Sequence, residues 1–247
     1  MRQWAHKASR ATAAVLFPDA CLACGRHVDR QGGLCTQCWP QIAFIERPYC
    51  AVTGAPFAHD FGDMLVSAEA MANPPDYERA RAACVHAAIA RQLATRLKYG
   101  DRTHLAPWMA RWMVRAGADL LADCDVIVPV PLHRLRFWRR RYNQSAELAR
   151  AVGARTGLPM QPAALVRRRA TRPQVGLTAR QRDANVRGVF AVPEGGRIAV
   201  AGRRILLIDD VLTTGATINA AARALNRAGA TGVDVLTFSR VVPGRDG

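Results

Sequence analysis

Lysine is nearly absent from this chain of 247 residues, and acidic residues are scarce. Lys7 and Lys98 are the two lysines, yet Lys and Arg together number 35 against 19 acids, which gives a formal net charge of +16. Arginine therefore carries the positive charge, and its planar guanidinium suits bidentate contacts with phosphate. The excess favours an anionic partner such as a nucleic-acid backbone, although a base composition rich in Arg codons explains the choice of Arg over Lys equally well.

Long apolar runs are also missing, since no uninterrupted stretch approaches the ~20 residues of a membrane span. Hydrophobic residues still make up 50% of the chain, so we expect a globular, soluble protein with a sizeable core. The N-terminus is basic and has no acid before Asp19, as in some targeting peptides. Its apolar stretch, residues 11–17, is short and no small-residue cleavage signature follows. We therefore favour a short amphipathic helix and a cytoplasmic protein.

Cysteines are concentrated at one end, with five of the seven in residues 1–60. Cys21 and Cys24 form one pair, Cys35 and Cys38 form another, and two residues separate the partners in each. This spacing lets four thiolates face one ion, so it predicts a tetrahedral structural zinc site. Two disulfides or four unpaired cysteines are the alternatives, and disulfides would require an oxidising compartment.

Three cysteines lie outside these pairs. Cys50 has no obvious partner. We expect His27 and His59 at the surface, because four sulfurs already complete the coordination of a zinc ion. Cys84 and Cys124 have apolar neighbours, so we expect them in the core.

The rest of the chain alternates between strand-like and helical patterns. The strand-like runs are 125–130, 188–192, 204–209 and 232–238, and the helical runs are 87–100, 103–121, 145–156 and 216–229. This alternation is typical of a parallel sheet with crossover helices. We therefore expect an α/β domain over residues 61–247 and an N-terminal helix with a zinc module over residues 1–60.

The stretch ILLIDDVLTTGAT, residues 205–217, combines features of a ligand site. Its apolar start predicts a central strand, and Asp209 and Asp210 follow where open α/β sheets bind ligands. Residues 213–217 then lead into a helix, so their backbone N–H groups and the threonine hydroxyls form an anion cradle. Gly215 allows the backbone to approach a phosphate closely.

One end of this stretch therefore suits a phosphate, and the acidic end suits hydroxyl donors or a metal. A phosphorylated sugar offers both. The alternative is an ordinary strand-to-helix turn with an Asp cap.

The string IDDVLTTGAT resembles the phosphoribosyl-pyrophosphate (PRPP) signature of type I phosphoribosyltransferases. Together with the cysteine pairs, it resembles the ComF/GntX family of bacteria, which is associated with DNA uptake in natural competence. Three further segments are similar to that family, namely 97–102 (LKYGDR), 128–149 and 177–190. The resemblance covers roughly residues 15–240.

Two positions depart from the family pattern. Cys50 is followed by Thr53 where a third cysteine pair is often completed, which favours the first four cysteines as the full ligand set. Arg141 stands where glycine commonly precedes the triplet Tyr-Asn-Gln of residues 142–144.

The resemblance implies a type I phosphoribosyltransferase-like fold that binds PRPP with Mg²⁺. Asp209 and Asp210 would contact the ribose hydroxyls and stabilise positive charge at the anomeric carbon. The 5′-phosphate would be held by Thr213, Thr214, Gly215, Ala216 and Thr217. Arg134 would bind the pyrophosphate.

An Arg-rich stretch, residues 167–187, would form a mobile hood over the site, with Arg180, Arg182 and Asn185 facing the ligand. A disordered basic linker is the alternative. Lys98 is a weaker site candidate, and we expect it to pack at a helix end.

The resemblance implies a PRPP-binding protein of DNA uptake that also binds single-stranded DNA. Arginine runs at 139–141 and 167–169 favour the DNA, and Trp138 and Tyr142 are candidates for base stacking, although such aromatics more often pack on the core. The alternative is an active transferase that moves phosphoribosyl to an unidentified nucleobase-like acceptor. A third hypothesis is that the zinc module is a docking surface for proteins of the uptake machinery.

Overall fold

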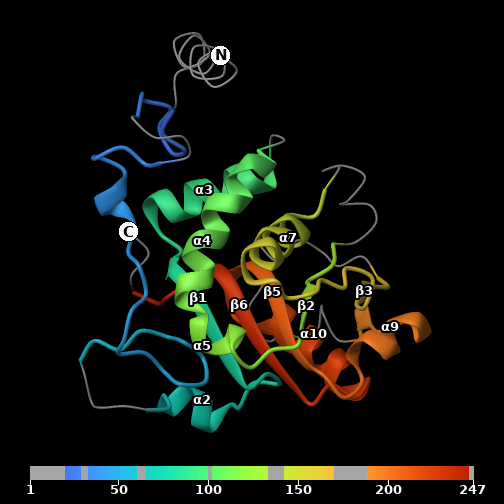
Figure 1. Ribbon diagram of the computed structural model, residues 1–247. Coiled ribbons are helices and arrows are strands. Elements are labelled where there is room, and N and C mark those ends of the chain that lie inside the picture. Colours follow the sequence, from blue (N-terminus) through green and yellow to red (C-terminus); the bar gives the residue numbers. More distant parts are fainter. Residues whose placement is uncertain are drawn as a thin grey trace, which may run out of the picture.

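The structure is a computed structural model that describes residues 20–28, 33–59, 65–99, 102–132, 142–169 and 188–244. Its centre is a parallel sheet of four strands in the order β1-β6-β5-β2 (Figure 1). The strands are β1 (Arg79–Val85), β2 (Val126–Pro129), β5 (Arg204–Leu212) and β6 (Gly232–Arg240). A separate antiparallel pair consists of β3 (Val166–Arg167) and β4 (Phe190–Ala191).

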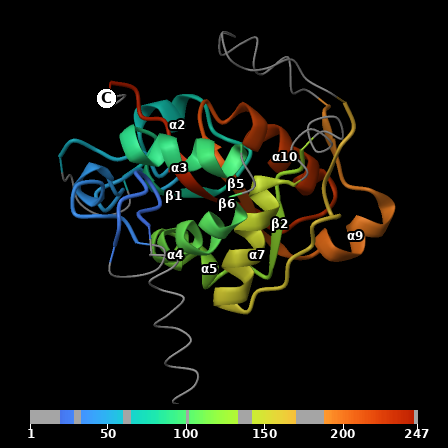
Figure 2. The same cartoon turned by 90° about the horizontal axis from the view of Figure 1, so that it is seen from above.

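Helices cover both faces of the sheet (Figures 1 and 2). One face carries α3 (Ala88–Lys98), α4 (Ala106–Ala116), α5 (Ala118–Leu121) and α7 (Gln144–Thr156), and the opposite face carries α10 (Ala216–Arg227). The short elements are α2 (Ala68–Ala72), α9 (Glu194–Val200), η1 (Trp39–Gln41) and η2 (Thr103–Leu105). None of the helices in the described part of the chain is long and apolar enough to span a membrane.

The apolar run of β5 explains its central place. Successive side chains of a strand point to opposite faces, so a strand covered on both sides must be apolar throughout. Leu206 and Ile208 pack in the core beneath α4 and α7, whereas Ile205 and Leu207 pack in the core beneath α10. All four are completely buried, so β5 lies between two cores.

Most of the predicted elements are confirmed, and the main differences concern the strands. Strand β1 was not predicted, and its sequence RARAACV carries two arginines that neighbouring carboxylates neutralise. The strand predicted at 188–192 shrinks to β4, which pairs with β3 instead of joining the main sheet. Cys84 and Cys124 are buried as expected.

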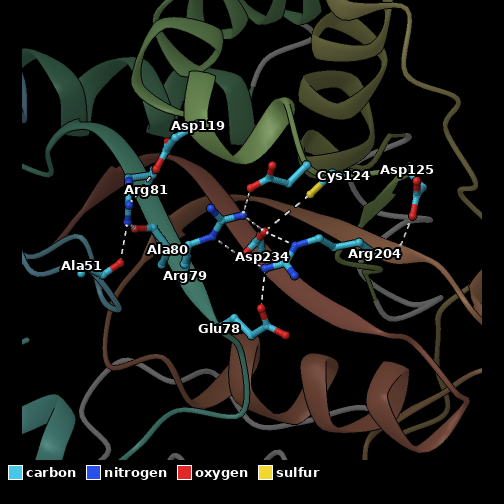
Figure 3. Close-up of polar contacts among 11 residues, drawn as sticks. Ala51, Glu78, Arg79, Ala80, Arg81, Asp119, Cys124, Asp125, Arg204 and Asp234 are labelled. Atoms are coloured by element: carbon cyan, nitrogen blue, oxygen red, sulfur yellow. Dashed lines mark hydrogen bonds and ion pairs between the residues drawn. The ribbon is translucent and has the colours of Figure 1, made fainter. Parts of the chain in front are cut away.

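A buried carboxylate, Asp234, lies at the amino end of the sheet (Figure 3). Arg79 donates to it through Nε at 3.1 Å and Nη2 at 2.6 Å, and Arg204 donates through Nε at 2.9 Å. Burial opposes ionisation of Asp234, but these two guanidinium groups outweigh it and hold its pKa below the ordinary value. Asp123 and Glu78 pair with the outer sides of Arg79 and Arg204. The cluster joins the starts of β1, β5 and β6.

The N-terminal cysteine module packs against the sheet and α3 (Figure 1). Its residues 43–45 run antiparallel to β1, with hydrogen bonds from Ile45 N to Ala83 O at 3.1 Å and from Val85 N to Ala43 O at 2.8 Å. Arg96 of α3 donates to the carbonyl of Leu22 at 2.7 Å. Backbone contacts therefore connect the module to the outer edge of the sheet.

Candidate functional site

The two adjacent acids lie on β5 near the carboxyl end of the sheet. Lys98 Nζ lies 2.9 Å from Asp210 Oδ2, whose side chain is only 6% exposed. Asp209 is half-buried, and its Oδ1 accepts hydrogen bonds from Ser145 Oγ at 2.7 Å and from the Asp210 backbone N at 2.9 Å. The sequence predicted that the acids follow the end of the strand. Strand β5 instead continues to Leu212, so both acids lie within it.

Lys98 is the last residue of α3, as expected of a residue at a helix end, and it also pairs with Asp210 of the candidate site. Helix α3 buries Leu93 and Leu97 and ends at Lys98. The amine therefore emerges beside the carboxyl end of β5 and places a positive charge against the acid pair.

Residues 142–145 support the acid pair from the other side. The Tyr142 hydroxyl donates to the Leu97 carbonyl, and Asn143 Nδ2 donates to the Val130 carbonyl at 3.0 Å. Asn143 Oδ1 also accepts from Ser145 N at 3.1 Å and so caps α7. These contacts fix Ser145 against Asp209. Tyr142 thus forms a hydrogen bond within the fold. The contact of Ser145 with Asp209 was not predicted, although Ser145 directly follows the Tyr-Asn-Gln triplet.

Burial and like charge oppose ionisation of the acid pair. Burial and the neighbouring charge of Asp210 together raise the pKa of Asp209 to about 7, while Ser145, the Asp210 N–H and Lys98 oppose the shift. Among the described residues a single amine, that of Lys98, lies against the two carboxylates, and hydroxyl donors or a further cation would stabilise their ionised form. The chemistry of these groups is compatible with the ribose hydroxyls and the Mg²⁺ that the family resemblance implies.

The loop after β5 has the features of an anion cradle. Thr213 and Thr214 are exposed, and Gly215 adopts a left-handed conformation with φ of 79° as it enters α10. The N-cap of this 12-residue helix is Gly215, which has no side chain to cap the first turn. Its N–H groups and the positive end of its dipole therefore face the loop, as a phosphate site requires. Ala216 and Thr217 begin the helix.

Several predicted site residues cannot be placed. Arg134, Arg180, Arg182 and Asn185 lie outside the described residues, as do residues 138–141. The hairpin of β3 and β4 brackets residues 170–187, with a hydrogen bond from Arg168 N to Val189 O at 2.8 Å. Arg167 lies over the ring of Phe190 at 5.4 Å. The base of the predicted hood is therefore a structured hairpin.

The four cysteines predicted to bind zinc come together. The Sγ atoms of Cys21, Cys24, Cys35 and Cys38 all lie within 4.8 Å of one another, and those of Cys24 and Cys35 are 3.6 Å apart. Zn–S bonds of about 2.3 Å in a tetrahedron place sulfurs about 3.8 Å apart, so the cluster fits a structural zinc ion. None of the cysteines, all of which lie in the described residues, forms a disulfide.

Cys50 occupies a similar backbone turn without a second thiol. Its Sγ accepts N–H bonds from Thr53 at 3.4 Å and Ser67 at 3.3 Å, and Gly54 follows with φ of 65°. Burial opposes ionisation, but these hydrogen bonds outweigh it and lower the pKa of Cys50 to about 7. A Cβ at Gly54 would meet the Ala80 carbonyl oxygen at 2.3 Å, so this turn packs directly on β1.

Comparisons with known proteins agree with this architecture. A double zinc ribbon domain matches residues 12–71, and a phosphoribosyl transferase domain matches residues 148–241. The chain is 30% identical over 216 residues to the DNA utilization protein YhgH of Escherichia coli K12, covering 85% of this chain and 91% of that protein. It belongs to the ComF family. The Competence protein F of Haemophilus influenzae is 27% identical over 233 residues, covering 91% of this chain and 98% of the relative.

Membership of the ComF family confirms the predicted family and fold, a phosphoribosyltransferase-like parallel sheet with a four-cysteine zinc module. Among solved structures, a Bacillus subtilis glutamine PRPP amidotransferase complexed with ADP and GMP matches 57% of this ComF-family chain at 21% identity, with a TM-score of 0.40. The match spans 30% of that enzyme. The matching domain family is a double zinc ribbon. Within the described residues of this ComF-family chain, a single four-cysteine cluster forms.

Proposed function

We propose that this ComF-family chain binds PRPP with Mg²⁺ at the carboxyl end of its sheet and serves DNA uptake in the bacterial cytoplasm, where it also binds single-stranded DNA. Its relatives named Competence protein F and DNA utilization protein YhgH support the uptake role. The observation that carries the ligand proposal is that two groups with different ligand preferences lie next to each other. The acids of β5 prefer hydroxyl donors or a metal, and the start of α10 prefers a phosphate. Two carboxylates on β5 precede by a few residues the N-terminus of α10, whose N-cap is Gly215.

Each part of the ligand has a matching group. Asp209 and Asp210 accept hydrogen bonds from the ribose hydroxyls, and residues 213–217 hold the 5′-phosphate with N–H groups and hydroxyls. Lys98 pairs with Asp210 and adds a positive charge beside the proposed sugar site. By resemblance to the family, Arg134 would bind the pyrophosphate, and Arg180 and Arg182 would belong to the hood over the proposed site. Magnesium supplies charge neutralisation for the pyrophosphate when it is bound.

Calorimetric titration with PRPP and Mg²⁺ tests this site. We expect binding by the wild type and at least about a 100-fold weaker affinity for the double variant Asp209→Asn/Asp210→Asn, because each hydrogen bond to a charged group contributes about 1.5–3 kcal/mol. The matched control Glu69→Gln/Glu194→Gln removes two acids elsewhere and should bind like the wild type. Absence of PRPP binding by the wild type would reject the assignment.

The DNA part of the proposal has its own readout. Binding of single-stranded DNA should weaken steeply with salt, because arginines displace counterions from the phosphates. It should survive the Asp209→Asn/Asp210→Asn change. Negligible DNA affinity at physiological salt would leave a small-molecule binding protein instead.

One observation also favours an active transferase. The pKa of Asp209 is raised to about 7, which suits a general base near neutral pH. An acceptor nitrogen would attack the anomeric carbon, pyrophosphate would leave, and the proton of the acceptor would pass to Asp209. Pyrophosphate release from PRPP in the presence of free nucleobases measures this reaction. We expect release to rise with pH through about 7 and to be lost in Asp209→Asn.

A further inference from the structure

Aromatic rings gather where the zinc module meets α4 and the edge of the sheet. Trp39 directly follows the zinc ligand Cys38, and 49% of its surface is exposed. Its ring lies 5.3 Å from that of Phe44 and 5.9 Å from that of Trp112, and Phe44 lies 5.3 Å from Trp112. Trp112 in turn stacks on the buried Phe238 at 5.9 Å. The exposed indole is therefore held at the surface by rings anchored in the core.

A pocket of about 260 Å³ opens beside these rings. Trp112 and Tyr49 contribute aromatic side chains to its lining, and Arg47 and Arg115 contribute guanidinium groups. Arg115 lies 5.1 Å from the ring centroid of Phe44, and Arg47 lies 5.8 Å from that of Tyr49. Two of the rings at this surface, Phe44 and Tyr49, therefore each have a guanidinium group beside them.

The charge of this surface is positive. Among the described residues that line the pocket, Glu46 is the one acid, and it pairs with Arg115 at 2.9 Å. Both side chains are largely exposed, so the pair is weak and easily exchanged. Arg111 is also exposed one turn before Arg115 on α4, on the same side of the helix. An anionic polymer complements three arginines and one acid.

We propose that this aromatic–arginine surface (Trp39, Phe44, Arg47, Trp112 and Arg115) binds single-stranded nucleic acid. Bases stack on Trp39 and enter the pocket beside Trp112, while the phosphates face the arginines. Stacking on protein rings accepts every base, and arginine adds electrostatic attraction to the backbone, so the site needs no sequence preference. The assignment rests on the single-strand binding proposed above and places it apart from the sugar-phosphate site on β5.

Fluorescence anisotropy with a labelled oligothymidylate tests the surface. Trp39→Ala should weaken the affinity about 5- to 100-fold, since one base–aromatic stack contributes about 1–3 kcal/mol. Trp39→Phe retains a ring and should restore most of the affinity. Arg115→Ala should lower the slope of log affinity against log salt by about one, whereas Glu46→Gln removes the acid and should strengthen binding.

Arg197→Ala is the matched control, because Arg197 is an exposed arginine on α9, at the opposite side of the molecule from the zinc module (Figures 1 and 2). It should leave affinity nearly unchanged. Zinc content and thermal unfolding confirm that each variant is folded. If the wild type binds the oligonucleotide and Trp39→Ala and Arg115→Ala bind equally well, the surface is not the site and the proposed function stands. If the folded wild type does not bind at all, the proposed single-strand binding fails as well.

Discussion

Carboxylates at the two ends of the central sheet have opposite pKa shifts. At the amino end, Asp234 receives two guanidinium groups, and its pKa is lowered. At the carboxyl end, Lys98 is the one cation among the described residues that lies against Asp209 and Asp210, and the pKa of Asp209 is raised to about 7. Complete pairing stabilises the fold and leaves nothing for a ligand to supply. Incomplete pairing costs stability and is expected where a ligand provides the missing partners.

The largest effect on stability is expected from removing the carboxylate at the amino end of the sheet. Asp234→Ala removes a fully buried carboxylate and leaves Arg79 and Arg204 without their shared partner, so it should lower the free energy of unfolding by roughly 3–5 kcal/mol. Urea denaturation measures this change. Glu147→Ala, which breaks the partly exposed pair with Arg150, should cost less than about 1 kcal/mol. A loss below about 1 kcal/mol for Asp234→Ala would mean that the cluster is not a structural centre.

At the carboxyl end, Asp210→Asn should act on the ligand and not on the fold. Its PRPP affinity should fall about 10- to 100-fold, the value of one hydrogen bond to a charged group. Stability should change by less than about 1 kcal/mol, because the half-buried Lys98 can turn toward solvent when its partner loses its charge. Calorimetry and urea denaturation on the same samples separate the two quantities. A large stability loss with unchanged affinity would reverse the assignment of the two ends.

The smallest effect is a difference in pH dependence. Asp209 has a raised folded pKa, so its contribution to stability is present below about pH 4 and is lost as the pH rises to about 7. Asp234 has a lowered pKa, so its contribution is present above about pH 4 and is lost as the pH falls through the folded value. Asp209→Asn should therefore gain about 1 kcal/mol or more over the wild type between pH 5 and pH 8, since one pKa unit corresponds to about 1.4 kcal/mol.

Urea unfolding at several pH values, with wild type and variant compared at each, isolates this contribution from other titrating groups. An unchanged difference between the two proteins from pH 5 to pH 8 would show that Asp209 ionises normally. The acid pair would then be as well compensated as Asp234.

Local patterns in the sequence were sufficient for much of the fold. The apolar run before Asp209 predicted a central strand, and the spacing of the cysteines predicted a four-sulfur cluster, because both signals lie within short segments. The same holds for α7 and α10, whose periodicity is regular. These features depend on neighbours in the sequence, which a single chain displays directly.

Features that depend on distant residues were missed. Strand β1 contains Arg79 and Arg81 among small residues, and it becomes a buried strand only because Asp234 and Asp119 neutralise these arginines. The contact of Lys98 with Asp210 joins residues more than a hundred positions apart. Such pairings follow from the topology of the sheet, and no spacing rule in the sequence reports them.

The backbone pairing of residues 43–45 with β1 has a consequence for self-association. Strand β1 is the last strand on its side of the main sheet, and an uncovered strand of this kind is a template for pairing with another molecule. The covering segment lies between the zinc ligand Cys38 and the turn at Cys50. Its position therefore depends on the metal-bound module, so removing zinc should open this edge and promote aggregation. The zinc ion would then protect the sheet of each chain from the sheets of its neighbours.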